Sequence, residues 1–392
     1  MARTLSVALA AAGLFVAAGA AASAQDQGEF RRSAYHDYRI VTVADGLINP
    51  WSMAFLPNGD MLVTERPGRL RIIRDGELLP GAVGGLPEVF AQGQGGLLDV
   101  VPHPEFGTNH LIYLSYSKPF VGEEGATTAI LRARFENDRL HDVEELFLAN
   151  SLVDSRRRGH YGSRLAFDGQ GFLFFSVGER QFPSQGDLEA HPAQDRSNHH
   201  GTVNRIHEDG RIPEDNPFVG QDGIEPSIYS YGHRNPQGLV IHPETGDIWA
   251  TEHGPQGGDE LNLIQPGLNY GWPVVGYGVN YRSGSAIHEG TMREGMEAPV
   301  HFWIPSIATS GLMIYSGDRF PAWKGDLFVG GLAGQQLSRL TLDGQSVMNE
   351  ETLVQRIGRI RDVREGPDGF IYVAIESSDG TPTRIVRLEP AD

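Results

Sequence analysis

The chain has 392 residues, no cysteine and a formal net charge of -18, and 40% of its residues are hydrophobic. A chain of this length can bury a large core without disulfide bonds, and the composition excludes cysteine as a nucleophile or a metal ligand. So large a negative charge also argues against binding to nucleic acid or to anionic lipid.

The first 24 residues are predicted to be a signal peptide. Arg3 precedes a run rich in alanine, leucine and valine, and Ala22-Ser23-Ala24 forms an A-x-A cleavage site before Gln25. The run is too short and too rich in alanine for a membrane anchor, and no cysteine follows the site to carry a lipid. We therefore expect the mature chain, residues 25–392, to be periplasmic and to lack a membrane span.

The mature chain repeats one short pattern six times: a proline or aspartate, a glycine turn and a run of β-forming residues. A second β-rich run follows each copy, so each unit predicts a β-hairpin. The copies are LPNGDMLVTE, HPEFGTNHLIYLSYS, FDGQGFLFFSVGE, HPETGDIWATEHG, FPAWKGDLFVGGL and GPDGFIYVAIESS, which begin at residues 56, 103, 167, 242, 320 and 366.

Six such units, about 60 residues apart, predict an all-β fold, a six-bladed β-propeller that forms a single domain over residues 25–392. A β-sandwich is the alternative, but it does not explain six copies. We also expect residues 38–43 (YRIVTV) to complete the last blade and to close the ring.

Polar residues lie in the segments between the predicted strands, and in a propeller such segments meet at one end of the central channel. Because the stretches come from different repeats, their side chains can converge on one site. The candidates are Gln94, His160, Glu179, Arg180, Arg234, Asn235, Gly254, Pro255, Asp259, Glu260, Arg359 and Arg361.

Arginines directed into the channel of an acidic protein predict an anion site, because guanidinium groups pair bidentately with carboxylates and phosphates. The alternative is pairing with a local acid, as Arg361 with its neighbour Asp362. His160 lies in a glycine-flanked turn and can act as a general base, with Glu179 to orient it. A single histidine, however, is more often structural.

The run HGPQGGDELN combines turn carbonyls with Asp259 and Glu260, the oxygen ligands that Ca²⁺ prefers. Zinc is not expected, because the chain lacks cysteine and an H-E-x-x-H motif. His191, His199 and His200 are close in sequence, but a histidine cluster in a loop is more often exposed to solvent. The chain also lacks G-x-G-x-x-G, G-x-S-x-G and P-loop motifs, which argues against NAD, a serine hydrolase and nucleotide binding.

Together these stretches resemble the soluble PQQ-dependent aldose sugar dehydrogenases of the glucose/sorbosone dehydrogenase family. The likeness extends from NPWSMAFLPNGDMLVTERPGRL to RIRDVREGPDGFIYV, and GQGGLLDVVPHPEF, GSRLAFDGQGFLF, GHRNPQGL and ELNLIQPGLNYGWP are specific in combination. The resemblance implies a six-bladed propeller and an oxidoreductase that oxidises aldose sugars at C1 to lactones, with a separate electron acceptor, as a monomer or a homodimer.

The resemblance also implies roles for individual residues. His160 would be the base for the C1 hydroxyl, Glu179 would orient it, and Arg234 would stabilise negative charge on the quinone oxygen. PQQ is a planar quinone with three carboxylates, and its implied contacts are Gln94, Arg234, Asn235, Arg359 and Arg361.

Two Ca²⁺ sites are implied in the same way. The carbonyls of Gly254 and Pro255 would bind the ion that polarises PQQ. Glu260 and the Tyr270 carbonyl would bind a second, structural ion, for which Asn280 lies near a position where the family has an aspartate.

One position departs from the family. A lysine that pairs with a PQQ carboxylate aligns with Ala333 in FVGGLAGQQLSRL. Losing one charge-assisted contact costs about 1.5–3 kcal/mol, or about ten- to a hundred-fold in affinity.

Two alternative functions stay open. One is a Ca²⁺-dependent lactonase, which needs inward carboxylates around a channel metal. The other is a non-catalytic binding propeller that has lost its cofactor through the change at Ala333.

Overall fold

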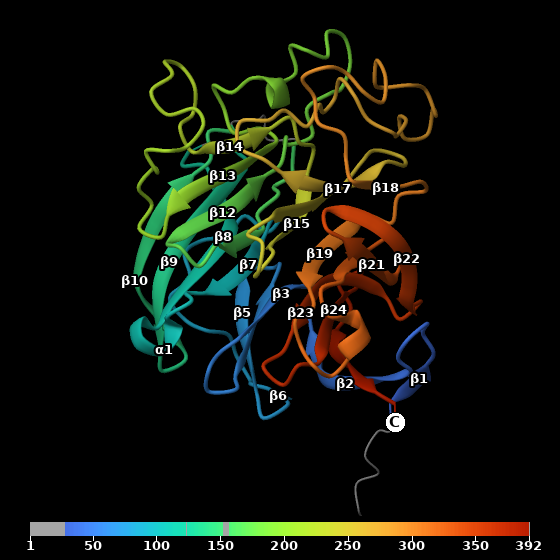
Figure 1. Ribbon diagram of the computed structural model, residues 1–392. Coiled ribbons are helices and arrows are strands. Elements are labelled where there is room, and N and C mark those ends of the chain that lie inside the picture. Colours follow the sequence, from blue (N-terminus) through green and yellow to red (C-terminus); the bar gives the residue numbers. More distant parts are fainter. Residues whose placement is uncertain (1–27, 123, 152–156, 392) are drawn as a thin grey trace, which may run out of the picture.

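The computed structural model describes residues 28–122, 124–151 and 157–391, and the predicted signal peptide lies outside these ranges. Within them the chain forms six antiparallel sheets arranged as the blades of a propeller, which confirms the predicted fold (Figure 1). No helix of the described part is both long enough and apolar enough to cross a membrane.

The first three complete blades follow the chain order, and each begins with its first strand at the centre of the ring. Blade one is β3 (Pro50–Phe55), β4 (Met61–Glu65), β5 (Arg69–Arg74) and β6 (Glu77–Leu78). Blade two is β7 (Leu97–Pro102), β8 (Leu111–Pro119), β9 (Ala126–Glu136) and β10 (Arg139–Leu148). Blade three is β11 (Leu165–Phe167), β12 (Phe172–Val177), β13 (Thr202–His207) and β14 (Ile228–Tyr231).

The remaining blades complete the ring. Blade four is β15 (Pro236–Ile241), β16 (Ile248–Glu252), β17 (Asp259–Ile264) and β18 (His301–Trp303). Blade five is β19 (Thr309–Ile314), β20 (Leu327–Gly331), β21 (Gln336–Asp343) and β22 (Ser346–Gln355). Blade six is β23 (Arg359–Glu365), β24 (Ile371–Glu376) and β25 (Thr383–Pro390), followed by β2 (Tyr38–Leu47) and β1 (Glu29–Arg31). Within the described ranges, helical structure is limited to α1 (Phe106–Asn109) and two 3-10 turns, Pro192–Gln194 and Pro321–Trp323.

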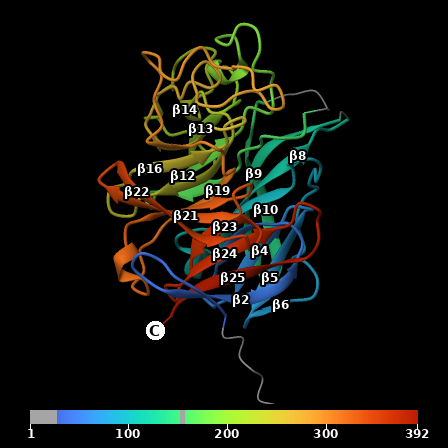
Figure 2. The ribbon, with the colours of Figure 1, turned by 90° about the vertical axis from the view of Figure 1, so that its right-hand side faces the viewer.

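The repeated sequence pattern corresponds to the second strand of each blade, and the run after it to the third. β2 lies beside β25 and pairs with it in register, Ile40 opposite Leu388, so the predicted ring closure is confirmed (Figure 2). A strand from the N-terminal part of the chain thus completes the C-terminal blade.

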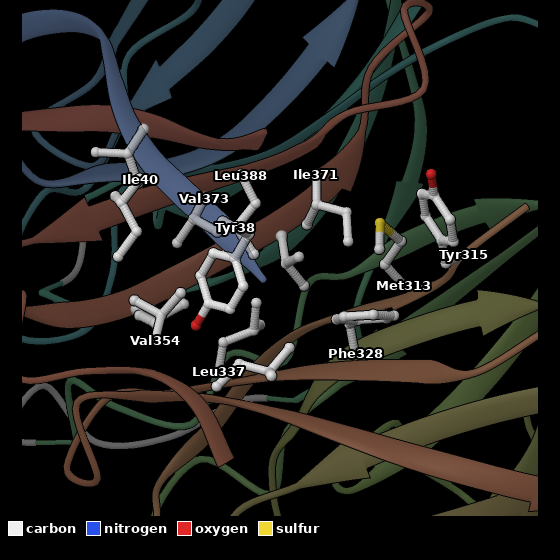
Figure 3. Packing of buried hydrophobic residues seen from close by; sticks show 14 of the residues in the cluster. Tyr38, Ile40, Met313, Tyr315, Phe328, Leu337, Val354, Ile371, Val373 and Leu388 are labelled. Carbon is white, nitrogen blue, oxygen red and sulfur yellow. The ribbon is translucent and has the colours of Figure 1, made fainter. Parts of the chain in front are cut away.

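Apolar side chains fill the spaces between neighbouring blades. Every residue of β4 and of β24 is buried, because each second strand has a blade on both of its faces. Figure 3 shows one such space, where Tyr38 and Val373 of blade six face Leu337 and Phe328 of blade five. This double burial explains why the repeated runs are almost continuously hydrophobic.

At the centre of the ring two carboxylates and two guanidinium groups form a buried ionic network. Arg164 Nη1 lies 3.3 Å from Asp99 Oδ1 and 3.0 Å from Asp362 Oδ1. Arg364 contacts the same two carboxylates, at 3.1 Å from Asp99 and 2.9 Å from Asp362. Asp99 and Asp362 are fully buried, and buried carboxylates need such partners.

The network contacts the first strand of every blade. It receives hydrogen bonds from Met53 in β3 and Leu165 in β11, and Arg164 donates to the Gln237 carbonyl in β15. In β19 a Cβ on Gly311 would lie 2.5 Å from Asp362 Oδ1, so glycine is required there for the strand to approach. The first strands are therefore held by one shared set of charges.

Two long segments cover one end of the ring, at the top of Figure 1: the β12–β13 connection and the β17–β18 connection. They contact each other, since Gln194 donates to the Trp272 carbonyl at 2.7 Å. The expectation that His191, His199 and His200 are exposed is wrong, because all three are buried in the first of these segments.

The buried histidines stay neutral. His199 Nδ1 accepts from the Asn150 N–H at 2.9 Å, and His200 packs edge-on against Phe182 with ring centroids 5.0 Å apart. Burial lowers the pKa of His199 to about 3 and that of His200 to about 4. These side chains fill the core of the segment instead of binding solvent.

Replacing Asp362 by alanine should lower the free energy of unfolding by about 3–5 kcal/mol, because Arg164 would remain buried without that carboxylate. Urea unfolding of D362A measures this loss. The matched control is Asp138→Ala, which removes an exposed ion pair with Arg74 and should cost at most about 1 kcal/mol. Equal losses in the two variants would contradict a central role for the network.

Stability should also fall as the pH drops below about 6.5. There the unfolded chain protonates His199 and His200 while the folded chain does not, so acid favours unfolding. Between pH 7.5 and 5.0 each histidine should contribute about 2 kcal/mol of loss. Urea unfolding at both pH values measures the fall in the free energy of unfolding. In H199Q this fall should be about 2 kcal/mol smaller than in the wild type. In H110N, which changes an exposed histidine, it should be the same as in the wild type. If H199Q loses as much stability between pH 7.5 and 5.0 as the wild type, the pKa of His199 is not lowered by folding.

Candidate functional site

The predicted site residues meet at one end of the ring because of strand direction. In an antiparallel blade the first strand begins where the second strand ends, so both positions lie at the same end of the channel. Residues at the start of first strands are Gln94, His160, Arg234, Asn235, Arg359 and Arg361, and residues just after second strands are Arg66, Glu179, His253, Gly254 and Pro255.

His160 and Glu179 form a buried pair, in which Nδ1 of the imidazole hydrogen-bonds to Oε1 of the carboxylate. The backbone N–H of His160 donates to Gln94 Oε1 at 2.8 Å, and Glu179 Oε2 accepts from the Phe182 N–H at 2.6 Å. Because Nδ1 is taken by Glu179, Nε2 is the ring nitrogen available to a ligand.

The environment keeps His160 neutral and Glu179 ionised. Burial lowers the pKa of His160, and the nearby charge of Arg234 lowers it further against the opposing effect of Glu179. Burial alone would raise the pKa of Glu179, but the hydrogen bond from His160 and the charge of Arg234 outweigh it and hold that pKa below its usual range. A neutral imidazole beside a carboxylate is suited to accept a proton.

Two cavities adjoin at this pair. One of about 400 Å³ is lined by His160, Glu179 and Arg234 together with Trp272 and Tyr281. The other, of about 280 Å³, is lined by Trp51, Arg66, Tyr161, Gln237, Arg359, Arg361 and Glu376, among others. Gln94 and His253 belong to both walls, so a ligand in one cavity lies next to a ligand in the other.

The smaller cavity carries an excess of positive charge. Arg361 pairs through Nε and Nη2 with Glu376, so the alternative pairing with its sequence neighbour Asp362 is wrong. Arg359 Nε is buried with no hydrogen-bond partner among the described residues, and burial lowers the pKa of Arg359. A half-buried guanidinium whose Nε has no partner fits a carboxylate ligand.

Arg234 links the larger cavity to the carbonyls that were predicted to bind metal. Its Nη1 donates to the Gly254 carbonyl at 2.8 Å, its Nε is buried with no partner among the described residues, and its guanidinium lies 5.1 Å from the Trp272 ring centroid. Asn235 is placed differently. Its Oδ1 accepts from the Gly162 N–H at 3.0 Å, it is 1% exposed, and it does not line either cavity.

The four residues predicted to bind metal come together around a third, very small cavity of about 10 Å³, about the volume for one water or ion. Its wall includes Gly254, Pro255, Glu260 and Tyr270, together with Glu252. Carbonyl and carboxylate oxygens are the donors that Ca²⁺ prefers. Among the described residues no cluster of three or more histidine, aspartate or glutamate side chains is arranged as a metal site.

The two neighbouring acids make different contacts. Burial and the charge of Glu252 raise the pKa of Glu260 well above its usual value, a repulsion that a bound cation would relieve. Asp259 instead holds the turn, accepting from the Gly254 N–H at 2.9 Å. Asn280 is not part of this cavity: it lines the 400 Å³ cavity and its amide donates to the Ser285 carbonyl.

Several wall residues were missed by sequence reasoning, and some of them had a usable signal. Arg66, His253 and Glu376 lie at the end of the repeated second strand or directly after it, the position that also holds Glu179. Aligning the repeats by that position would have found them. Trp51 and Trp272 had no comparable signal, since one lies in a first strand and the other in a long connection.

Comparison with known proteins places the chain in context. Residues 47–387 match the glucose/sorbosone dehydrogenase family. The aldose sugar dehydrogenase YliI of Escherichia coli is 42% identical over 349 residues, 87% of this chain and 91% of the relative. The apo-form crystal structure of the soluble aldose sugar dehydrogenase of Escherichia coli aligns with a TM-score of 0.82 at 37% identity, covering 90% of this chain and 100% of that one. The PQQ-bound aldose sugar dehydrogenase of Streptomyces coelicolor gives a TM-score of 0.70 at 28% identity, over 92% and 99% of the two chains.

Proposed function

The chain belongs to the glucose/sorbosone dehydrogenase family, and on this premise we propose that it oxidises aldose sugars at C1 to lactones with PQQ and Ca²⁺. It is an oxidoreductase acting on the CH–OH group of sugars. One observation carries the proposal: the neutral His160, oriented by Glu179, lies where a cavity for a polar ligand adjoins a cavity rich in guanidinium groups. A sugar and a polyanionic cofactor can thus be held in contact.

The cofactor would be held in the 280 Å³ cavity by Arg359, Arg361 and Gln94, with Arg234 at the junction and Asn235 behind the wall. The unpartnered Nε of Arg359 supports this assignment. When bound, PQQ supplies a quinone that takes up a hydride as a two-electron acceptor.

Ca²⁺ is proposed at two positions. The Gly254 and Pro255 carbonyls would bind one ion outside the 10 Å³ cavity, on the side of the 400 Å³ cavity that Pro255 also lines, where it acts as a Lewis acid next to the cofactor. Glu260 and the Tyr270 carbonyl would bind the second ion, and the nearby Glu252 adds a carboxylate that the sequence did not indicate.

His160 Nε2 removes the proton of the sugar C1 hydroxyl, while the C1 hydrogen leaves as hydride and the C1–O bond becomes the lactone carbonyl. Glu179 stabilises the imidazolium that forms and keeps its Nδ1 proton in place. Arg234 offers an unpartnered Nε and stabilises negative charge that develops in the site. The channel carboxylates Asp99 and Asp362 are already neutralised by arginines, which argues against a lactonase that binds metal there.

The proposed setting is the periplasm, reached through the signal peptide of residues 1–24, with a separate protein or small molecule as electron acceptor. We propose a monomer or a homodimer as the working form. The net charge of -18 supports a function without nucleic acid.

Ala333 lies in the β20–β21 turn, where its N–H donates to the Ile307 carbonyl, and its neighbour Leu332 lines the 280 Å³ cavity. The chain has two lysines, Lys118 and Lys324. Both are at the surface and pair with Glu145 and Asp318, respectively. Neither supplies the cation that the family has at this turn.

Apo-protein reconstituted with PQQ and Ca²⁺ should oxidise glucose or another aldose to its lactone with a dye acceptor, and His160→Gln should reduce kcat by about 10²–10⁴-fold. Dye reduction and lactone formation measure the activity of the wild type and of the variant. PQQ affinity of H160Q should stay close to that of the wild type, since the base does not hold the cofactor carboxylates.

The control is His242→Asn, which changes a histidine in the β15–β16 turn at the opposite end of blade four and should leave kcat unchanged. The dehydrogenase proposal fails if the wild type oxidises none of a panel of aldoses. Undiminished kcat in H160Q would remove His160 from the role of base.

Ala333→Lys should tighten PQQ binding about ten- to a hundred-fold, because it adds a charge-assisted contact beside Leu332. The dissociation constant is measured by titrating apo-protein with PQQ and following tryptophan fluorescence. Gln345→Lys is the control, since it adds the same charge at the exposed β21–β22 turn. No difference between A333K and Q345K would show that this turn does not approach the cofactor.

A further inference from the structure

We propose that Arg66 holds a carboxylate of the cofactor and supplies, from blade one, the cation that blade five lacks at Ala333. The inference rests on the proposed function, because it concerns the same PQQ cavity. It assigns a binding role to a residue for which the sequence reasoning gave none.

Arg66 follows β4 directly and is held in place by the segment that leads into blade two. Its Nη1 donates to the Gly93 carbonyl at 2.8 Å, and its own carbonyl accepts from the Leu97 N–H at 3.2 Å. A Cβ on Gly96 would lie 2.1 Å from that carbonyl oxygen, so glycine is needed for this close approach. The side chain is therefore positioned at the cavity wall before any ligand binds, which lowers the cost of binding.

The charges around the 280 Å³ cavity do not balance. Its described wall carries the guanidinium groups of Arg66, Arg359 and Arg361 and the single carboxylate of Glu376. Arg361 occupies Oε2 of Glu376 with two N–H groups, while Arg66 Nη2 lies 3.5 Å from Oε1. Two positive charges therefore remain to be compensated by a ligand.

The pKa of Arg66 reflects this excess. Burial lowers the pKa of Arg66, and the charges of Arg361 and Arg359 lower it further against the opposing effect of Glu376. An anion between these side chains would reverse that repulsion. A ligand with several carboxylates on a planar frame matches three guanidinium groups on one wall.

The position of Arg66 relative to Ala333 explains how it can compensate. Leu332, from the same turn as Ala333, lines this cavity on the blade five side, and Arg66 lines it on the blade one side. Blade six, with Arg359 and Arg361, lies between them in the ring. The cationic wall is thus complete over blades six and one, without a charge on blade five.

The test is a titration of apo-protein with PQQ in the presence of Ca²⁺, followed by tryptophan fluorescence and independent of turnover. Arg66→Gln should weaken PQQ binding about ten- to a hundred-fold, and Arg66→Lys should weaken it less, because it keeps the charge. The affinity of the wild type should fall with added NaCl, and more steeply than that of R66Q. The matched control is Arg69→Gln. Arg69 of β5 pairs with Glu65 of β4, and its loss should leave the affinity within about three-fold of wild type.

The outcomes separate the two proposals. If the wild type does not bind PQQ, the proposed function fails and this inference with it. If the wild type binds and R66Q binds as tightly as R69Q, only the role of Arg66 is refuted. A melting temperature that falls in R66Q with an unchanged dissociation constant would make Arg66 a structural partner of Glu376. A loss in R66K as large as in R66Q would refute compensation by charge.

Discussion

Four charged side chains at the centre of the ring hold the first strands of the blades together. Asp99 and Asp362 are fully buried, and Arg164 and Arg364 each contact both carboxylates. Burying a carboxylate is tolerated only with such partners. Because the partners are as far apart in the chain as Asp99 and Arg364, the network forms only when the ring has closed. The pairing of β2 with β25 closes the ring and so brings the central charges together, and these charges in turn hold the closed ring.

The candidate site takes its geometry from this network. His160 lies four residues before Arg164, in the segment that leads into β11, and Arg361 in β23 directly precedes Asp362, so the central charges fix the backbone next to both. The site also shows that local charge is independent of net charge. In a chain of formal charge -18, the closed ring gathers arginines on one cavity wall and leaves a neutral imidazole next to it. The proposed function depends on this arrangement of a base beside an anion pocket.

Much of the architecture was predictable from local pattern. Glycine turns and β-forming runs predicted the second and third strands of every blade, and residues 38–43 were correctly expected to close the ring. The pairing of His160 with Glu179 also agrees with expectation. First strands were harder to see, because β11 has only three residues. Asn235 was expected at the cavity, but it holds the backbone of Gly162 instead.

By itself, the sequence determined the number of blades, the hairpin of each blade, the strand that closes the ring and the residue types at one end of the channel, because turns and β-forming runs are properties of neighbouring residues. Only the tertiary structure decided which charges pair. Arg361 contacts Glu376, not the adjacent Asp362, and Asp362 is instead taken by Arg164, 198 positions away. The burial of His199 and His200 also became visible only in the tertiary structure. Pairing and burial depend on distances between blades, and those distances exist only in the closed ring.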